Sequence, residues 1–158
     1  MRKRIVATVL ALCLVLGLVP GTAWAVEMET SGKCGKNATW SFDAATETLT
    51  ISGTGAMDDY SCEWYSNPPP YIGWNGYEGN YIRSVVVSEG ITHIGSDAFG
   101  SFTMFGILFQ LKHVKLPRTL KSIGACAFAN AESLTSIVLP DGLVSIDSYA
   151  FSGTKLTS

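Results

Sequence analysis

One phrase occurs twice in this sequence with its apolar residues in the same places. LPRTLKSIGACAF begins at Leu116, and LPDGLVSIDSYAF begins 23 residues later, at Leu139. Extending the alignment upstream gives three copies of one pattern, over residues 82–99, 111–128 and 134–151. Self-similarity at a period of 20 to 50 residues is typical of solenoids, so the chain is expected to stack repeated units.

The aligned copies share their last two residues. Each ends in an alanine followed by a phenylalanine, which places Phe99, Phe128 and Phe151 in register. The starts of the units are spaced 29, 23 and 22 residues apart, counting a fourth unit that opens at Leu156. A large side chain recurring at one place in every unit predicts a continuous column of core residues through the stack.

The third copy shows what one unit predicts locally. Ile137 and Leu139 alternate with polar or outward positions, as in a short strand, and the turn residues 140–142 end it because proline donates no hydrogen bond. Leu143 and Ile146 then point a second short segment inward. The sequence therefore predicts two short extended segments in every unit, joined by a turn.

A single unit is too small to fold alone. It offers about six apolar side chains, each worth about 1.5–3 kcal/mol when buried, against roughly 1.5 kcal/mol of ordering entropy for each of its ~22 residues. The units must stack to become stable. The predicted fold is mainly β: a short solenoid of stacked units.

The pattern L-x-x-I-x-L-P-x-x-L-x-x-I-G-x-x-A-F resembles the BspA-like leucine-rich repeat, a bacterial secreted and cell-surface type. The resemblance covers residues 82–158 closely, and it implies a parallel β solenoid with a role in adhesion or protein binding. The sequence departs from the family pattern at Asp147, where glycine is usual, and lacks the cysteine that often follows the A-F pair. The expected units are 82–110, 111–133 and 134–155, with the start of a fourth at 156.

The first 25 residues predict a signal peptide. Three basic residues precede an uncharged, predominantly apolar stretch of 15 residues, Ile5 to Val19, and a Pro-Gly pair leads to A-W-A, which ends at Ala25. A stretch of this length falls short of the ~20 predominantly apolar residues that cross a bilayer as a helix. We therefore expect cleavage after Ala25 and export, to the cell surface or the medium.

Removing the signal peptide leaves eight basic and 13 acidic side chains, a formal net charge of −5. No basic cluster remains, which argues against nucleic acid as a partner. Three cysteines remain, an odd count for an exported protein. We expect a disulfide between Cys34 and Cys62, which flank the predicted hairpin, leaving Cys126 outside it.

Residues 26–81 are expected to hold an N-terminal cap and an aromatic-rich connection. ATWSF and TLTISG, within residues 38–53, are β-prone runs separated by DAATE, which predicts a β-hairpin that shields the first unit. Seven Tyr and Trp residues follow between residues 58 and 81, among them Trp64, Tyr65 and Trp74. These aromatics suit either stacking against a sugar or packing over the end of the first unit.

The first unit also carries an apolar insertion, GSFTMFGILFQ, that includes Phe102 and Phe105. Insertions in repeats bulge from one face, often the binding face. The alternative is a short helical turn that packs onto the flank of the unit.

No residue pattern predicts a chemical reaction. The sequence has no G-x-S-x-G, H-E-x-x-H, phosphate-loop or C-x-x-C motif. His93 and His113 occupy non-equivalent positions of successive units, so surface roles are favoured over a metal pair. Asp58, Asp59 and Glu63 lack the spacing of a calcium loop and are better explained as turn residues. We expect no enzyme activity, no cofactor and no metal.

Two functions remain open at this point. The first is a secreted or cell-surface binding and adhesion module that engages a host or matrix protein through its repeats. The alternative is a carbohydrate-binding module that uses the aromatic segment 60–81. The third unit ends at Phe151 with only the start of a fourth behind it, so we expect either that the natural protein is longer or that another molecule covers the open end. If the 158-residue chain is complete, we expect it to self-associate through residues 134–158.

The signal-peptide prediction is tested by sequencing the N-terminus of the secreted protein. The first residue should be Val26, because A-W-A supplies the small residues that signal peptidase requires. A mature chain that keeps Ile5 to Val19 would contradict it.

Overall fold

The structure is a computed structural model that describes residues 30–60, 82–100 and 110–157. All the regular elements in these residues are β-strands, as the mainly β prediction requires. The strands are β1 (Ser31–Lys33), β2 (Ala38–Asp43), β3 (Thr48–Gly53), β4 (Gly55–Ala56), β5 (Ser84–Val87), β6 (Ile91–Ile94), β7 (His113–Lys115), β8 (Ser122–Ile123) and β9 (Ser145–Ile146).

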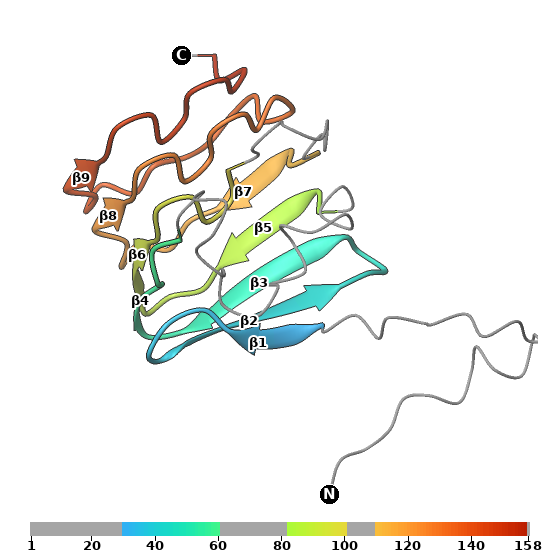
Figure 1. The fold of residues 1–158 in the computed structure, drawn as a ribbon, viewed down its shortest axis with the longest axis vertical. Helices are drawn as coiled ribbons and strands as arrows, with labels where there is room; N and C mark the ends of the chain where they lie inside the picture. The colour runs from blue at the N-terminus through green and yellow to red at the C-terminus, as the bar shows by residue number, and fades with distance from the viewer. Residues whose placement is uncertain (1–29, 61–81, 101–109, 158) are drawn as a thin grey trace, which may run out of the picture.

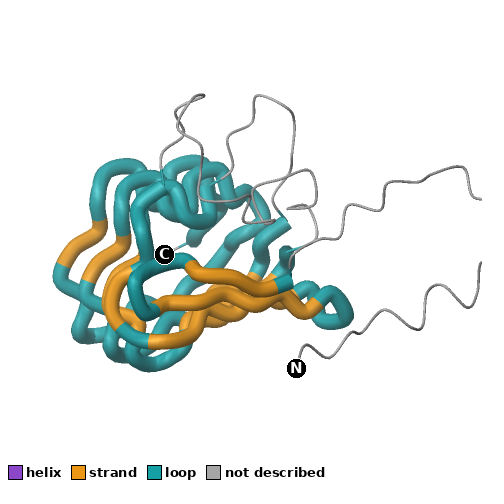
Figure 2. Tube along the Cα trace, turned by 60° about the horizontal axis from the view of Figure 1, so that its bottom comes forward, coloured by secondary structure: helices purple, strands orange, loops and turns teal. Residues whose placement is uncertain are grey.

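The strands form two sheets that the chain visits in turn (Figure 1). Sheet A has the order β1-β2-β3-β5-β7, and sheet B has the order β4-β6-β8-β9. From β3 onward in sheet A, and throughout sheet B, neighbouring strands are parallel. In Figure 2 the successive turns of the chain lie one behind another, with strands along two adjoining sides and loops along the third. The predicted parallel β solenoid is confirmed.

We name the stacked turns coil 1 (82–99), coil 2 (111–128) and coil 3 (134–151), after the three copies in the sequence. The structure adds a turn that the repeat pattern did not reveal: residues 48–60 form coil 0. Thr48–Ile51 of β3 pairs with Ser84–Val87 of β5, and β4 pairs with β6. Coil 0 therefore continues the solenoid toward the N-terminus.

The predicted β-hairpin is present and is fused to the stack. β2 and β3 pair from Ala38↔Gly53 to Asp43↔Thr48, and β1 pairs with β2 on the far side. Asp43 stabilises the connecting turn, since its carboxylate accepts hydrogen bonds from the Ala45 backbone N–H and the Thr46 hydroxyl, each at 2.9 Å. β3 is thus both an arm of the hairpin and the sheet A strand of coil 0.

A column of stacked phenylalanine rings fills the interior, as the alignment predicted. The ring centroids of Phe99 and Phe128 are 5.3 Å apart, and so are those of Phe128 and Phe151, the second pair being nearly parallel. Phe99 and Phe128 are fully buried. Further inward columns run beside the rings, such as Val85 above Leu49 in sheet A.

Backbone conformation confirms the register of the three copies. The residue before each A-F pair has a left-handed backbone, with φ of 56° at Asp97, 55° at Cys126 and 60° at Tyr149. Non-glycine residues seldom adopt this conformation, so its recurrence at one position marks a shared turn. The N–H of Phe99 donates to the Ala127 carbonyl at 2.7 Å, and the N–H of Phe128 donates to Ala150 at 2.8 Å.

The strand predicted at Ile137–Leu139 is wrong, because sheet A ends at β7 in the described residues. In coil 1 the N–H of Ser88 donates to the Ile51 carbonyl at 2.9 Å. Proline takes this place at Pro117 in coil 2 and at Pro140 in coil 3, and it has no N–H to donate. Coils 2 and 3 therefore both lack this hydrogen bond. Coil 2 nevertheless keeps its strand, β7, so the proline does not by itself explain the missing strand of coil 3.

Close packing between coils explains the glycine of the repeat pattern. A Cβ on Gly95 would collide with the carbonyl oxygen of Asp58 in coil 0, and a Cβ on Gly124 would lie 2.5 Å from the Ser96 nitrogen in coil 1. Coil 3 departs from this pattern with Asp147, whose side chain is exposed.

The phenylalanine column leads to a stability prediction. Phe128→Ala should lower the free energy of unfolding by about 3–5 kcal/mol, because it leaves a cavity between two stacked rings. Lys121→Ala, at an exposed position of the same coil, should change it by less than about 0.5 kcal/mol. Urea unfolding of both variants measures the difference, and equal small effects would contradict the register.

Candidate binding surface

Sheet A is the larger of the two sheets in the described residues, and its outer side is the candidate binding surface. Along each strand, buried side chains alternate with exposed or half-buried ones, so every second residue points outward. We call the outward set the sheet A face. Its residues are Ser31, Lys33, Thr39, Ser41, Asp43, Thr48, Thr50, Ser52, Ser84, Val86, His113 and Lys115.

Strand register lines these side chains up in rows across the sheet. One row runs Ser31, Ser41, Thr50, Val86 and Lys115, with one residue from each of the five strands. Neighbouring strands lie about 4.8 Å apart, so this row spans roughly 20 Å. A surface of this width can contact a folded partner across several strands at once.

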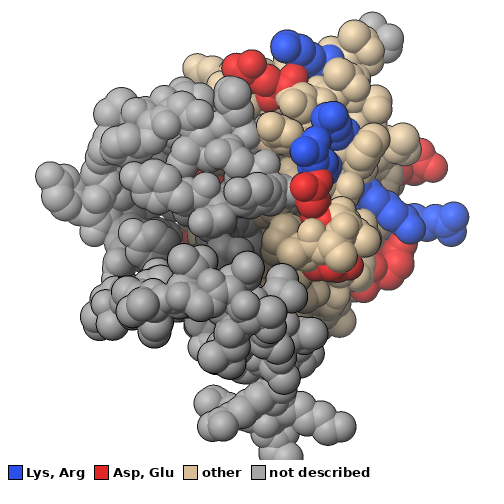
Figure 3. All heavy atoms as spheres, turned by 90° about the vertical axis from the view of Figure 1, so that its right-hand side faces the viewer, with Lys and Arg blue, Asp and Glu red and all other residues tan. Residues whose placement is uncertain are grey.

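Short hydroxyl side chains dominate the sheet A face, and its charges lie toward its edges. Lys33 and Asp43 belong to the hairpin, while His113 and Lys115 are exposed on β7. Arg83 forms an ion pair with Glu47 beside the start of β5. On the side of the molecule that Figure 3 shows, basic and acidic side chains are interspersed rather than gathered by sign.

Sheet B carries a smaller hydrogen-bonded group that joins three coils, which we call the polar ladder. His93 Nδ1 lies 2.7 Å from the Ser122 hydroxyl, and His93 Nε2 lies 3.4 Å from Asp59 Oδ1. The same Asp59 oxygen accepts a 2.7 Å hydrogen bond from the Ser96 N–H. That hydrogen bond is the main cause that lowers the pKa of the Asp59 carboxyl below its ordinary value of 3.8.

Serine, histidine and aspartate also occur together in hydrolases, but the polar ladder does not have the geometry of a catalytic triad. The Asp59–His93 distance of 3.4 Å is long for a hydrogen bond that orients a base. The Asp59 side chain is 68% exposed, so solvent weakens its effect on His93. We interpret the polar ladder as a link between coils 0, 1 and 2.

Most site residues suggested by the sequence lie outside the described residues, so their roles stay predictions. These residues are Cys62, Glu63, Trp64, Tyr65, Trp74, Phe102 and Phe105. Cys34 is described and buried, and burial, with a smaller contribution from Asp58, raises the pKa of its thiol to about 12. Its pairing with Cys62 also stays a prediction.

The two histidines lie in different sheets, His93 in sheet B and His113 in sheet A. Among residues 30–60, 82–100 and 110–157, no group of three or more His, Cys, Asp or Glu side chains is placed to hold a metal ion. Within the same ranges, no helix is long and apolar enough to cross a membrane.

Residues 101–158 match the family model for the BspA type leucine rich repeat region, a model of six copies. The chain carries a BspA-type leucine-rich repeat region. Leucine-rich repeat families are generally non-enzymatic binding modules, and those of the BspA type are typically bacterial surface or secreted proteins. No curated protein matches this chain.

Two solved bacterial structures are similar to this BspA-like protein. A leucine-rich repeat protein from Eubacterium ventriosum is 30% identical, with a TM-score of 0.61 over 78% of this chain. The chain spans only 29% of the length of that protein. A leucine-rich repeat protein from Bacteroides capillosus is 18% identical, with a TM-score of 0.49 over 82% of this chain and 96% of its own.

The sheet A face was missed at the sequence level, although a signal for it was present. ATWSFD, TLTISG and SVVV alternate small polar with apolar residues, and that alternation predicts one outward side for each strand. The alignment of these outward sides into rows depends on the pairing of β3 with β5, which joins segments from the cap and the repeats.

The polar ladder leads to a prediction of pH dependence. Because the folded-state pKa of Asp59 is lowered, its charge stabilises the fold above pH ~4, and this contribution is lost as pH falls through the lowered value. Asp59→Asn should therefore destabilise the protein at neutral pH and have little effect in strong acid. Urea unfolding across this pH range tests it, with Asp141→Asn at an exposed turn as the control; the same loss at every pH would contradict it.

Proposed function

We propose that this BspA-like protein is an exported, non-enzymatic adhesion module that binds a host or matrix protein through the sheet A face. The observation that carries the proposal is the set of rows of outward side chains that crosses five strands. Solenoids commonly use such extended surfaces to bind other proteins.

The composition of the sheet A face supports a protein partner. Serine and threonine hydroxyls both donate and accept hydrogen bonds, and they lose little side-chain entropy on binding. Lys115 adds a cationic group and His113 an imidazole on β7, and Val86 adds an apolar contact near the middle of a row. A mixed surface of this kind is typical of non-obligate protein interfaces.

Export is part of the proposal and rests on the predicted signal peptide over residues 1–25. The acidic mature chain, with a formal net charge of −5, also supports a protein partner over nucleic acid.

The second candidate function is carbohydrate binding by residues 60–81. It is favoured by one specific observation, the seven Tyr and Trp residues between residues 58 and 81. Aromatic rings present flat apolar faces with polar edges, which suits sugar rings as well as protein hot spots.

Binding of the mature protein to a panel of immobilised serum and matrix proteins tests the proposal. Thr50→Arg, at the centre of a row, should weaken the strongest interaction at least about tenfold, since a large charge would lie inside the interface. Ser145→Arg on sheet B is the matched control, because it adds the same side chain to the other sheet.

The two candidate functions give different patterns in the same assay. Binding that survives Thr50→Arg but is lost after Trp74→Ala, and after enzymatic deglycosylation of the panel, would replace the proposal with carbohydrate binding. Unfolding curves for each variant show whether the fold is retained.

A further inference from the structure

Coil 2 holds most of the positive charge of the repeats. We call its four basic residues the basic band: Lys112, Lys115, Arg118 and Lys121. All four are exposed, and no aspartate or glutamate occurs in the sequence between Asp97 and Glu132. Because they are spaced three residues apart, they form no basic run in the sequence, and their grouping appears only when the chain is divided into coils.

The basic band follows coil 2 from sheet A to sheet B. Lys115 ends β7 on the sheet A face, Arg118 lies in the turn that follows, and Lys121 directly precedes β8 (Figure 1). Three residues of chain span at most about 10 Å, so neighbouring Cα atoms of the band lie within that distance. The Debye length is about 8 Å at physiological ionic strength, so an anionic segment beside one of these cations is also attracted by the next.

The cations of the basic band are not neutralised by their surroundings. Within residues 30–60, 82–100 and 110–157, the ion pairs are Arg83–Glu47 and His93–Asp59. Glu89 of coil 1 accepts a 3.1 Å hydrogen bond from the backbone N–H of Arg118, not from its guanidinium. Lys121 Nζ lies 3.4 Å from the Gly142 carbonyl, a contact that leaves its charge uncompensated. The positive charges are therefore available to a partner.

Apolar and acidic residues flank the basic band. Val86 pairs with Lys115 across sheet A, and on sheet B the N–H of the exposed Val144 donates to the Lys121 carbonyl at 2.7 Å. Coil 3 carries two acidic residues and no basic one. A long polymer of uniform negative charge would extend over these acids and gain nothing from the valines. A protein segment that has both acidic and apolar side chains fits the band and its neighbours together.

We infer that the basic band of coil 2 binds an extended acidic segment of another protein, one that carries apolar side chains between its carboxylates. The segment lies along coil 2 and crosses the corner between sheet A and sheet B. The inference goes beyond the adhesion proposed above, because it also uses sheet B. It holds or fails whether or not the rows of the sheet A face bind a partner.

Fluorescence anisotropy of the mature protein with a labelled synthetic peptide rich in glutamate and leucine tests the inference. The peptide should bind, and binding should weaken steadily as salt is raised from about 0.05 to about 0.5 M. A peptide with glutamine in place of every glutamate should not bind. Absence of binding by the acidic peptide, or equal binding of both peptides, would overturn the inference.

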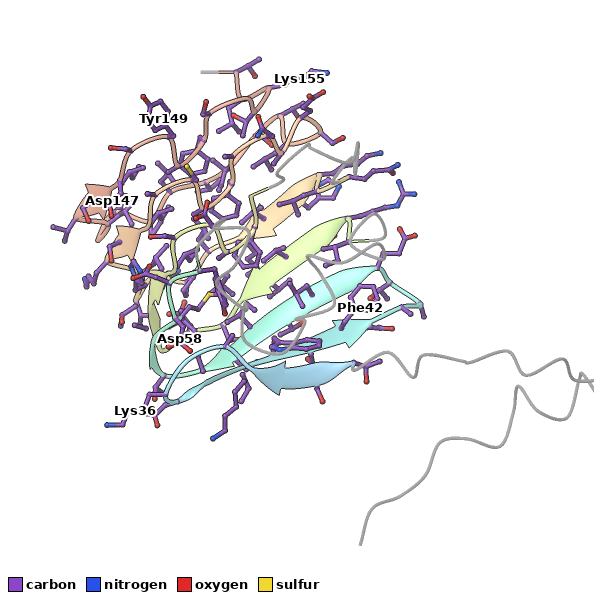
Figure 4. The ribbon with its side chains drawn as sticks, in the orientation of Figure 1. Lys36, Phe42, Asp58, Asp147, Tyr149 and Lys155 are labelled. Atoms are coloured by element: carbon purple, nitrogen blue, oxygen red, sulfur yellow. The ribbon has the colours of Figure 1, made fainter. Side chains whose placement is uncertain are left out.

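Charge reversal locates the contact. Lys115→Glu and Lys121→Glu should each weaken peptide binding about three- to tenfold, and the double variant should weaken it at least about tenfold. Lys36→Glu is the matched control, because Lys36 projects from the hairpin end of the stack and the variant has the same net charge as each single variant (Figure 4). It should change binding by less than about twofold, since salt screens charges far from the contact. Equal losses in all three single variants would show that net charge alone attracts the peptide and would overturn the assignment to coil 2.

The class of partner is tested by competition in the same assay. Double-stranded DNA, dextran sulfate and vesicles of phosphatidylserine with phosphatidylcholine should each compete more weakly than the unlabelled acidic peptide at equal concentration of negative charge. Stronger competition by one of them, lost in the Lys115→Glu and Lys121→Glu double variant, would assign the basic band to that polyanion and overturn the inference. Urea unfolding curves of the variants verify that the fold is retained.

Discussion

Everything in this structure depends on contact between equivalent positions of successive coils. The Phe128 ring stacks on Phe99 on one side and on Phe151 on the other, at 5.3 Å in both cases. The backbone also joins successive coils, because the Phe128 N–H donates a hydrogen bond to the Ala150 carbonyl of the next coil. A single coil would therefore leave apolar side chains exposed and backbone polar groups without partners. The stability of each coil depends on the coils stacked beside it.

How much of the fold could be predicted follows from this dependence. Inward residues repeat because each must fit the one before it, which is why the alignment alone placed the phenylalanines in one column. Coil 0 escaped detection because Leu49, Ile51 and Met57 keep only part of the inward pattern, and the register shifts between Gly55 and Ala56. The error at Ile137–Leu139 has another cause, because local alternation predicts an extended segment but does not determine whether that segment pairs with its neighbour.

The binding surface was harder to predict than the fold, for the same physical reason. Outward positions bear no packing constraint, so they differ from coil to coil and leave no repeat to detect. Thr50, Val86 and Lys115 share a row across three strands although they have no chemical similarity. Sequence reasoning instead favoured residues that are conspicuous by type, such as Trp64 and Phe102, which lie outside the described residues.

Because outward residues differ from coil to coil, the chemistry of the outer surface changes along the axis of the solenoid. Where coil 2 places Lys115 and Lys121 outward, the aligned residues of coil 3 are Val138 and Val144, which are 84% and 82% exposed. The outer surface thus changes from cationic to apolar within a single step of the stack. A partner that contacts several coils would meet a different chemistry at each one, and this difference fixes its orientation along the solenoid.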